Sequence, residues 1–520
     1  MGQDKAAPWW QGAVIYQLYP RSFRDSNGDG IGDLRGILEG LDHVASLGVD
    51  AVWLCPVYAS PGADLGYDVA DHMAVAAEYG TLQDLDALIA ACHGRGLRVL
   101  LDLIVGHTSE AHPWFLESRA GREGPLAGRY VWADPKADGS PPNNWLSVFG
   151  GPAWRWEPAR RQFALHHFLP QQPALNLADP ATMDAMAEVM RFWLARGADG
   201  FRVDALDFVA HDPLLRSNPA AGLRETPAKL FGMQQHLHDM MGEATDAVLA
   251  RLRAEADAFP NRALLGEFSS QPGAFQRIAR ATGPGRLHMA YTLAPLRVGF
   301  GVAAARGLIE AAAHPEGWPC WSFSNHDVVR TASRWAPEGG PDPRTTRMLL
   351  ALLLTLRGSV SLYQGEELGL TQVDIPSHAI RDRAGRDGSR TPIPWRHDAP
   401  HGGFTTGTPW LPVPDPHRGL AVDRQEADVA SPLRFTRAML ALRRANPALR
   451  RGALEPLELA APLVGFDRVT EAARLRCVFN LSGEAAPIPA TLAAPAIPGA
   501  PVPGIGESLA AWSAAMGQAG

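Results

Sequence analysis

Cysteine is scarce in this chain. Four of its 520 residues are cysteine, and they stand far apart, at positions 55, 92, 320 and 477. This spacing excludes the paired cysteines of a zinc site and the dense framework of a disulfide-stapled domain. Three of the four lie in apolar or helical surroundings, so we expect buried free thiols.

Long apolar runs and an excess of basic residues are also missing. The longest apolar run, residues 348–356, lies between Arg347 and Arg357 and is too short to cross a bilayer. Residues 1–5 do not begin an apolar run of the kind found in signal peptides, so we expect a cytoplasmic protein that does not enter a membrane. The formal net charge of -7 offers no basic surface for nucleic acid.

The chain does contain a regular alternation of strand-like and helix-like segments, from residue 13 to about residue 450. Helical patterns include residues 228–259 and 344–357. Eight short apolar runs are typical of buried parallel strands, and they cover residues 13–19, 51–54, 98–105, 200–204, 263–267, 287–291, 320–324 and 359–363. This order predicts an α/β protein built as a (β/α)8 TIM barrel, in preference to an open doubly wound sheet.

Additions to the barrel are expected at two places. Residues 107–178 follow the third strand, are rich in Trp, Pro, Gly, Asn and His, and are too long for a simple loop, so we expect an inserted subdomain there. Residues 452–520 contain short apolar runs broken by Pro, Gly and Ala, which predicts a small C-terminal β-sandwich domain. The catalytic barrel would then comprise residues 1–106 and 179–451.

Carboxylic acids follow three of the predicted strands. Asp204 ends the fourth strand two residues after Arg202, so both side chains point to one face and the cation favours the ionised carboxylate. Glu267 ends an apolar run at the fifth strand, where burial would raise its pKa. Asp327 follows the seventh strand. Barrel enzymes build their active sites at the C-terminal ends of their strands, so these acids predict one shared site.

Acids grouped around one pocket suit the cleavage of glycosidic bonds. One carboxylate attacks carbon while another protonates the leaving oxygen. Asp204 fits the nucleophile, Glu267 fits the acid, and Asp327 with His326 would hold sugar hydroxyls. An isolated Arg-x-Asp is more often a structural ion pair, so the assignment depends on the combination of acids.

These motifs together resemble the α-amylase family of retaining glycosidases. Its four signature regions are similar, in order, to residues 102–107, 200–204, 266–267 and 323–327. Three further segments resemble motifs of its α-glucosidase and oligo-1,6-glucosidase branch, namely residues 15–23, 172–176 and 363–367. Two segments, residues 324–330 and 477–482, look most like those of bacterial α-glucosidases with strong glucosyl-transfer activity.

The resemblance implies a role for individual positions. Asp204 would be the nucleophile, Glu267 the general acid/base and Asp327 the stabiliser of the transition state. Arg386 would close a pocket for one glucose. The remaining substrate contacts would come from Asp64, Tyr67, His107, Phe149, Phe168, Arg202 and His326. A surface turn remains an alternative for Asp64, and packing within the subdomain remains one for the two phenylalanines.

The first βα loop contains a separate pattern. Oxygen-bearing side chains alternate along residues 25–33, with Gly30 at the turn, as in the first half of a calcium loop. Gly36 stands where an EF-hand has its glutamate, so this is not an EF-hand. The resemblance implies one structural Ca²⁺ ion, held by Asp25, Asn27, Asp29, the carbonyl of Ile31, and Asp33. The alternative is a metal-free loop of Asx-turns. No organic cofactor is expected.

Three features depart from the family pattern. Gly106 stands where many members have an Asn that supports the sugar site, and Ala174 replaces the Asp of the fifth motif. Residues 380–386 look shorter than their counterparts, which affects the alignment of Arg386. None of these changes touches the three acids.

We therefore expect a retaining, exo-acting α-glucosidase, monomeric or homodimeric. It would remove terminal glucose from short α-glucosides such as maltose and pass it to water or to acceptor alcohols or sugars. The small Ala205 resembles members that prefer α-1,4 bonds. One alternative is a sucrose-acting or isomaltulose-forming transglycosylase. Another is a non-catalytic relative that kept the barrel as a scaffold, which the retention of Asp204, Glu267 and Asp327 disfavours.

Overall fold

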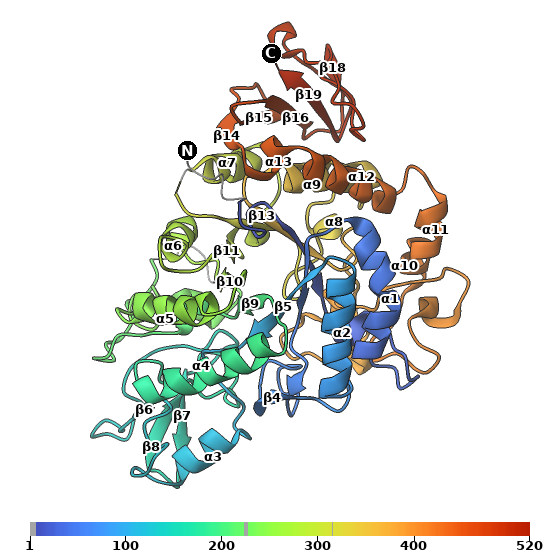
Figure 1. The fold of residues 1–520 in the computed structure, drawn as a ribbon. Helices are drawn as coiled ribbons and strands as arrows, with labels where there is room; N and C mark the ends of the chain where they lie inside the picture. Colours follow the sequence, from blue (N-terminus) through green and yellow to red (C-terminus); the bar gives the residue numbers. More distant parts are fainter. Residues whose placement is uncertain (1–6, 223–226, 315, 520) are drawn as a thin grey trace.

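A ring of parallel strands forms the centre of the protein (Figure 1). The computed structural model describes residues 7–222, 227–314 and 316–519. The strands of the eight-stranded sheet are β1 (Val14–Leu18), β2 (Ala51–Leu54), β5 (Arg98–Leu103), β9 (Gly200–Val203), β10 (Ala263–Phe268), β11 (Met289–Thr292), β12 (Cys320–Ser322) and β13 (Ser359–Tyr363). They pair in the order β11-β10-β9-β5-β2-β1-β13-β12, and a parallel bridge between Ala290 and Pro319 joins the two ends. This nearly closed barrel confirms the predicted fold class.

Each barrel strand leads into a helix on the outside. These helices are α1 (Leu34–Leu47), α2 (Leu82–Gly94), α4 (Pro180–Ala195), α5 (Thr245–Asp257), α6 (Ala274–Ala281), α7 (Val302–Ala313), α9 (Pro343–Thr355) and α12 (Pro432–Ala445). Local sequence fixes several of their ends. Thr81 and Asp84 form a capping box at the start of α2, and Asp179 caps α4 ahead of Pro180.

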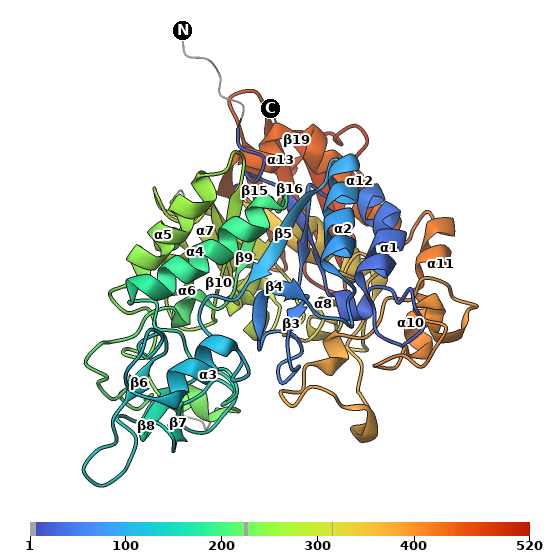
Figure 2. The same ribbon diagram turned by 60° about the horizontal axis from the view of Figure 1, so that its bottom comes forward.

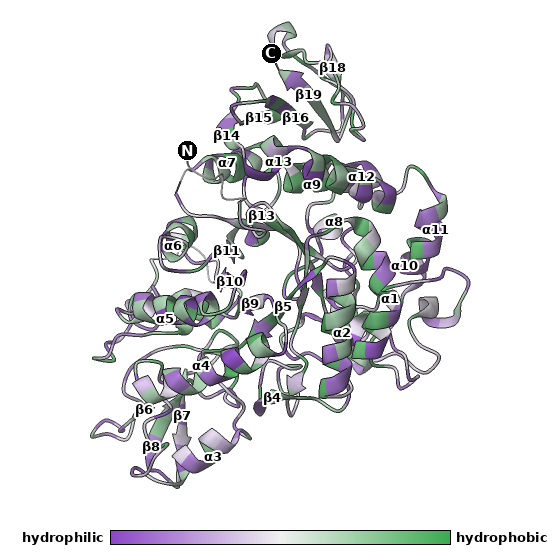
Figure 3. Cartoon of the chain, viewed as in Figure 1, coloured by the Kyte–Doolittle hydropathy of each residue, from purple (hydrophilic) through white to green (hydrophobic). Residues whose placement is uncertain are grey.

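The alternation of side chains along the strands separates two cores. One set packs inside the barrel and includes Ile15, Trp53, Leu100, Leu265 and Tyr291. The residues between them point outward and pack against the helices. The hydrophobic strands and the mixed helix surfaces can be followed in Figure 3. Because the inward series continues to Asp102 on β5 and Glu267 on β10, polar groups form the next layer above the apolar interior.

The inserted segment and the C-terminal domain lie at opposite ends of the barrel (Figures 1 and 2). Between β5 and α4 the chain forms α3 (Pro113–Ala120) and an antiparallel sheet of β6 (Trp132–Ala133), β7 (Trp154–Glu157) and β8 (Gln162–Leu165). A short hairpin of β3 (Tyr58–Ala59) and β4 (Asp71–Val75) follows β2. The irregular segment after β13 contains only α10 (Asp415–Gly419), α11 (Val422–Ala427) and short 3-10 turns.

The C-terminal domain is an antiparallel β domain. Its main sheet consists of β14 (Ala453–Pro456), β15 (Leu463–Val469), β16 (Arg474–Asn480) and β19 (Ser513–Ala519), and a smaller sheet pairs β17 (Ala486–Pro487) with β18 (Ser508–Leu509). Helices α7, α9 and α13 (Pro447–Arg451) lie between the barrel and the main sheet (Figure 1). All four cysteines are buried and free, as predicted. Within the described parts of the chain, no helix is both long enough and apolar enough to span a membrane.

The segment after the fourth barrel strand differs from prediction. Residues 228–259 do not form one helix, since α5 begins at Thr245. Between β9 and α5, the described residues 204–222 and 227–244 form two 3-10 turns as their only helical elements, η2 (Leu206–Phe208) and η3 (Leu230–Met233). Two glycines in this segment, Gly232 and Gly242, lower its helix propensity. A Cβ atom on Gly242 would lie 2.4 Å from the carbonyl oxygen of His211, so the close approach of the backbone there requires glycine. This long loop forms part of the cavity wall described below.

Candidate active site

A cavity of about 820 Å³ opens at the C-terminal end of the barrel strands. Most of the residues predicted to act on substrate line it, namely Asp64, Tyr67, His107, Phe149, Phe168, Asp204, Glu267, Asp327 and Arg386. Arg202 and His326 are buried beneath them and contact the lining residues directly. Residues from distant parts of the sequence thus meet at the end of the barrel where barrel enzymes carry out their chemistry.

Arg202 is the centre of the acid cluster. Its Nη1 donates to a carboxylate oxygen of Asp204 at 2.6 Å and to one of Asp102 at 2.7 Å. Its Nη2 donates to Glu267 and, at 3.0 Å, to the hydroxyl of Tyr291. The parallel register sets Asp102 opposite Arg202 and Glu267 opposite Tyr291. One fully buried cation therefore faces three carboxylates.

This crowding changes the protonation of the acids. Burial raises the pKa of Glu267 to about 7, Arg202 opposes the shift, and the charges of Asp204 and Asp327 add to it. Burial also raises the pKa of Asp204. Arg202 lowers it, as the sequence predicted, but burial and the charge of Asp102 have the larger effect. Near neutral pH the pair can keep one proton, so one acid can donate it while the other attacks as a carboxylate.

The surroundings of Asp327 favour its ionised form, whereas those of Asp204 and Glu267 favour the protonated form. Arg386 donates to its Oδ1 at 3.0 Å and Arg390 donates to the same oxygen at 2.9 Å. Burial alone would raise the pKa of Asp327, but His326 and the two arginines hold it well below its ordinary value. Asp327 is therefore ionised and can balance positive charge that develops beside it.

Arg386 also closes one side of the cluster. Its Nη2 donates to Asp64 at 2.5 Å, and its Nε donates to Asp382 at 2.8 Å. The segment after β13 is thereby joined to the loop after β2 and to the loop after β12. These contacts place Arg386 at the site, as the resemblance implied in spite of the short segment before it.

Neutral histidines and an aromatic ring complete the deep end of the cavity. The ring of Tyr67 stacks on His326 with centroids 5.2 Å apart and planes 2° apart. His107 Nε2 lies 3.1 Å from the carbonyl of Tyr67. Burial lowers the pKa of His107 to about 4 and that of His326 to about 3. Uncharged imidazoles can exchange hydrogen bonds with sugar hydroxyls without adding charge to the cluster.

Phe149 and Phe168 both face the cavity. Their ring centroids lie 5.9 Å apart, and Phe168 also lies 5.3 Å from the ring of His107. The guanidinium of Arg386 lies 5.2 Å from the ring centre of Phe149, within the range of a cation–π contact. Both rings thus lie where the predicted hydrophobic walls would stand, and Phe168 also packs against Phe208.

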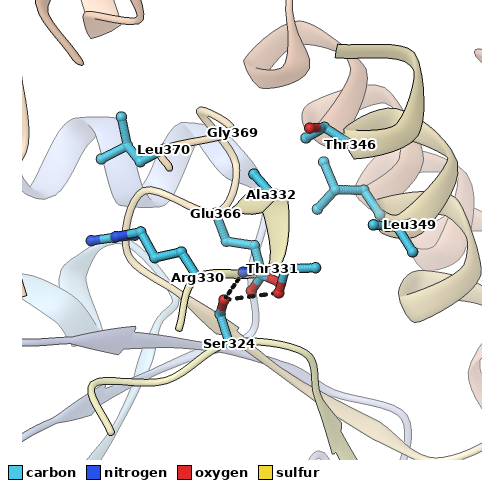
Figure 4. A pocket seen from close by; sticks show the side chains of 10 residues that line it. Ser324, Arg330, Thr331, Ala332, Thr346, Leu349, Glu366, Gly369 and Leu370 are labelled. Atoms are coloured by element: carbon cyan, nitrogen blue, oxygen red, sulfur yellow. Dashed lines mark hydrogen bonds between the residues drawn. The ribbon is translucent and has the colours of Figure 1, made fainter. Parts of the chain in front are cut away.

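A hydrogen-bond network supports the loop that contains Asp327 (Figure 4). Ser324 and Thr331 flank this loop, and their hydroxyls lie 2.8 Å apart. The Thr331 hydroxyl also lies 3.2 Å from a carboxylate oxygen of Glu366, which follows β13. Burial raises the pKa of Glu366 to about 7. These contacts fix both ends of the loop and so limit where Asp327 can move.

Several residues at the site were not predicted as site residues. They are Asp102 and Tyr291, which hold Arg202, Arg390, which holds Asp327, and Gln172, which donates to Asp64 at 3.0 Å. Asp102 and Tyr291 occupy inward-facing positions in predicted strands, and Gln172 begins the fifth motif. The sequence therefore did contain a signal for these three residues. Arg390 lies in an irregular segment without any periodic pattern.

A fourth strand that continued past Asp204 would point Asp207 away from Arg202 and Asp204. The strand instead ends at Val203, and Ala205 has a φ of 43°, so the chain turns sharply after Asp204. Asp207 is buried, lines the cavity and lies 3.0 Å from the Nε of Arg277. It joins the loops after β9 and β10 and has no contact with the three acids.

The loop of residues 25–33 contains the oxygen donors that Ca²⁺ prefers. Asp25 Oδ1 accepts hydrogen bonds from the backbone N–H groups of Asn27 and Gly28, at 2.9 and 2.8 Å. Asp25 Oδ2 accepts from Gly30 at 2.8 Å and from the Thr405 hydroxyl at 2.5 Å. Asx-turns therefore hold the loop, and the donor set suits a hard cation in its chemistry.

The carboxylate oxygens of Asp25, Asp29 and Asp33 nevertheless do not lie close enough together to share one ion as the loop stands. Within the described residues, one group of His, Cys, Asp and Glu has its potential ligand atoms within 4.8 Å of one another, and it consists of the largely exposed His397, Asp398 and Asp423. A Ca²⁺ ion would hence have to draw Asp25, Asp29 and Asp33 together.

Gly106 and Ala174, the two departures from the family motifs, have different structural surroundings. Gly106 lies beside a small space bordered by His107, His167 and Asp204, and a Cβ atom there would meet nothing within 4 Å. Ala174 is buried, and its backbone pairs with Leu165 of β8 and bridges to His107. The first change leaves room next to the acids, whereas the second leaves the backbone pairing of the motif intact.

Comparison with known proteins identifies the family. The model of the alpha amylase catalytic domain matches residues 17–452 of this chain. The chain belongs to the α-amylase family. A probable alpha-glucosidase of Rhizobium meliloti (strain 1021) is 46% identical over 502 residues, which cover 92% of this chain and 90% of the relative.

Solved structures agree with this membership. The crystal structure of the alpha-glucosyl transfer enzyme XgtA superimposes with a TM-score of 0.93 at 44% identity and covers 99% of this chain and 100% of that one. The trehalulose synthase MutB of Pseudomonas mesoacidophila MX-45 gives a TM-score of 0.88 at 29% identity, with the same coverage. The α-amylase-family chain described here is a glycoside hydrolase, so the non-catalytic scaffold alternative is discarded.

Proposed function

We propose that this glycoside hydrolase is a retaining, exo-acting α-glucosidase that also transfers glucose. Asp204 attacks the anomeric carbon of a terminal α-linked glucose while Glu267 protonates the leaving oxygen. Glu267 then takes a proton from water or from an acceptor hydroxyl, which displaces Asp204. The observation that carries the proposal is the attachment of both acids to one guanidinium, because retaining enzymes need carboxyl groups only ~5 Å apart, against ~6.5–9.5 Å in inverting ones.

The exo-acting part of the proposal is supported by Arg386. Its ion pairs with Asp64 and Asp327 cross the deep end of the cavity, where a longer chain of sugars would have to pass. The remaining contacts of this end, Tyr67 and His107, suit the ring face and the hydroxyls of a single glucose. Maltose and similar short α-glucosides are the substrates we propose.

One residue beside the nucleophile and the similarity to two solved structures bear on linkage preference and on the balance of hydrolysis and transfer. The small Ala205 beside the nucleophile favours α-1,4 bonds. Transfer is favoured by the similarity to the alpha-glucosyl transfer enzyme. Action on sucrose is a second candidate, which the similarity to the trehalulose synthase favours. Analysis of the products formed from maltose, isomaltose and sucrose separates these activities.

The anomer released first tests the mechanism. Proton NMR during maltose cleavage should show α-glucose before mutarotation, whereas β-glucose would overturn the retaining assignment. The Asp204→Asn variant should lose turnover while still binding maltose, since it keeps the shape of the nucleophile without its charge. Asp415→Asn is a matched control, because the side chain of Asp415 is 92% exposed and lies in α10. Normal rates in Asp204→Asn would exclude the assigned nucleophile.

We also propose that residues 25–33 bind one structural Ca²⁺ ion through Asp25, Asn27, Asp29, the Ile31 carbonyl and Asp33. The all-oxygen donor set supports this, and the position of the loop, with its Asp25 contact to Thr405, points to a role in stability. Chelation should lower the thermal midpoint and leave the room-temperature rate nearly unchanged. An unchanged midpoint would mean that the Asx-turns alone hold the loop.

A further inference from the structure

The charge of the cavity wall changes between the deep end and the mouth. Among the described residues, every carboxylate in the wall has an arginine partner. Asp64 pairs with Arg386, Asp204 and Glu267 with Arg202, Asp207 with Arg277, and Asp327 with Arg386 and Arg390. The other ionised side chains that the structure describes in the wall are cations, namely Lys229, Arg297 and Arg334.

These three cations come from three separate loops. Lys229 precedes η3 in the long loop after β9, Arg297 ends η4 (Ala294–Arg297) after β11, and Arg334 ends α8 (Thr331–Arg334) after β12. The ammonium of Lys229 lies 5.6 Å from the ring centre of Phe149, which places it just outside the proposed glucose site. All three cations line the cavity that contains the acids, and the leaving group or the acceptor must occupy that cavity outside the glucose site.

Nearby acids act on this group through space, since Asp327 and Asp382 raise the pKa of Lys229 and Glu366 raises that of Arg334, but they form no ion pair with it among the described residues. Within residues 7–222, 227–314 and 316–519, no carboxylate forms an ion pair with Lys229, Arg297 or Arg334. Arg334 donates to the carbonyls of Val329 and Phe323, but Arg297 and Lys229 have no hydrogen-bond acceptor of their own in these ranges.

The cations also repel one another. Burial lowers the pKa of Lys229, and the positive charges of Arg297 and Arg386 lower it further, although Asp327 and Asp382 oppose the shift. Burial lowers the pKa of Arg334 to about 10, where Glu366 opposes the shift and Arg297 adds to it. An anion placed among them would remove this repulsion and would gain attraction from each. A neutral sugar or alcohol could do neither.

We propose that the mouth of the cavity selects acceptors and leaving groups that carry an oxyanion, either a carboxylate or a phosphate monoester. The inference rests on the proposed glucosyl transfer. Apolar side chains between the cations, including Phe231, Leu293 and Leu296, would contact the carbon skeleton of such a molecule. The acceptor's hydroxyl oxygen bonds to the anomeric carbon as the bond from that carbon to Asp204 breaks, and the hydroxyl proton passes to Glu267.

Paired acceptors that differ in charge test the proposal. The donor is p-nitrophenyl α-glucoside, and the acceptors are 4-hydroxybenzoate against 4-hydroxybenzamide, and glucose 6-phosphate against glucose. We expect the anionic member of at least one pair to be glucosylated roughly fivefold better, the ratio that about 1 kcal/mol produces. Preference in one pair identifies carboxylate or phosphate as the group bound. About 500 mM NaCl should reduce the preference because salt screens exposed charges.

Substitution of the cations tests whether they cause the preference for anionic acceptors. Lys229→Gln and Arg297→Gln should each reduce the ratio of anionic to neutral product, and the ratio is measured within each variant so that a general loss of activity cancels. Lys136→Gln and Arg424→Gln are matched controls at exposed positions and should keep the wild-type ratio. Equal use of both members of both pairs by the wild type, or full preference in both cation variants, would overturn the proposal. Failure to release p-nitrophenol at all would instead count against the proposed function.

Discussion

Asp204 and Glu267 are bound by two nitrogen atoms of the same guanidinium, that of Arg202. A charge on either acid is felt by the other, so the two must titrate as a coupled pair. The arrangement favours the state with one proton and one negative charge, which the proposed first step requires. It also leaves little room for both acids to be ionised at once.

Glu267 should reduce the stability of the protein at high pH. Its pKa in the fold, about 7, lies above the ordinary value of 4.5, so the folded state binds a proton that the unfolded chain releases. Stability is therefore lost as pH rises through this range. We expect Glu267→Gln to stabilise the fold by roughly 2 kcal/mol more at about pH 8 than at about pH 5, while turnover of maltose falls. Unfolding measured at both pH values checks this, and an equal gain at both would contradict it.

Arg386 should support activity by holding Asp327 and Asp64 in place. It lowers the pKa of Asp327, but the Asp204–Glu267 pair takes up its second proton at a much higher pH than Asp327 does, so the pair sets the acid limit of activity. Arg386→Ala leaves Asp64 and Asp382 unpaired, and we expect kcat/KM to fall by about 100-fold or more. The pH profile of kcat/KM is the measurement, with Arg424→Ala as the matched control. We expect a lower rate with an unchanged acid limb, and an acid limb that moves to a higher pH would contradict the assignment of that limb to the Asp204–Glu267 pair.

The parts of the site that follow regular strands could be predicted from the sequence. Asp204 and Glu267 each end an apolar run, and the alternation of side chains fixes the face to which they point. Their pKa values could not be predicted from these neighbours alone. The nearest cation in sequence, Arg202, lowers the pKa of Asp204, yet burial and Asp102 decide the outcome.

The parts that depend on irregular chain were beyond the sequence pattern. Arg390 reaches Asp327 from a segment in which backbone hydrogen bonds follow no period. The region around Lys229 was predicted as helix, whereas it contains only a 3-10 turn, Ala228 and Phe231 line the cavity, and Leu230 and Met233 are exposed. Tertiary contacts override local preference in both places.

Two glycines, one at the start of β9 and one in the loop after β5, should respond in opposite ways to alanine. Gly200 has a φ of +146°, and a Cβ atom there would lie 1.8 Å from the carbonyl oxygen of Ala263, so Gly200→Ala should destabilise the protein by about 3 kcal/mol or prevent folding. Gly106 has open space and no left-handed φ, so Gly106→Ala should be neutral or stabilising by up to ~1 kcal/mol. Thermal midpoints of the two variants test the pair, and comparable losses would contradict the role assigned to backbone geometry.

Arg468 should hold the C-terminal domain to the barrel. It is fully buried on β15 and donates to the carbonyls of Thr355, Leu449 and Gly452, which lie at the ends of α9 and α13. Burial lowers its pKa to about 9, so its charge opposes folding, but Arg468→Met would leave three carbonyls without a donor at roughly 1–3 kcal/mol each. We expect a net loss of about 2–4 kcal/mol in stability with kcat/KM unchanged, since Arg468 lies far from the acids. Arg451→Met, at an exposed neighbouring position, is the control. A rise in the thermal midpoint of Arg468→Met would show that the burial of the cation outweighs its hydrogen bonds.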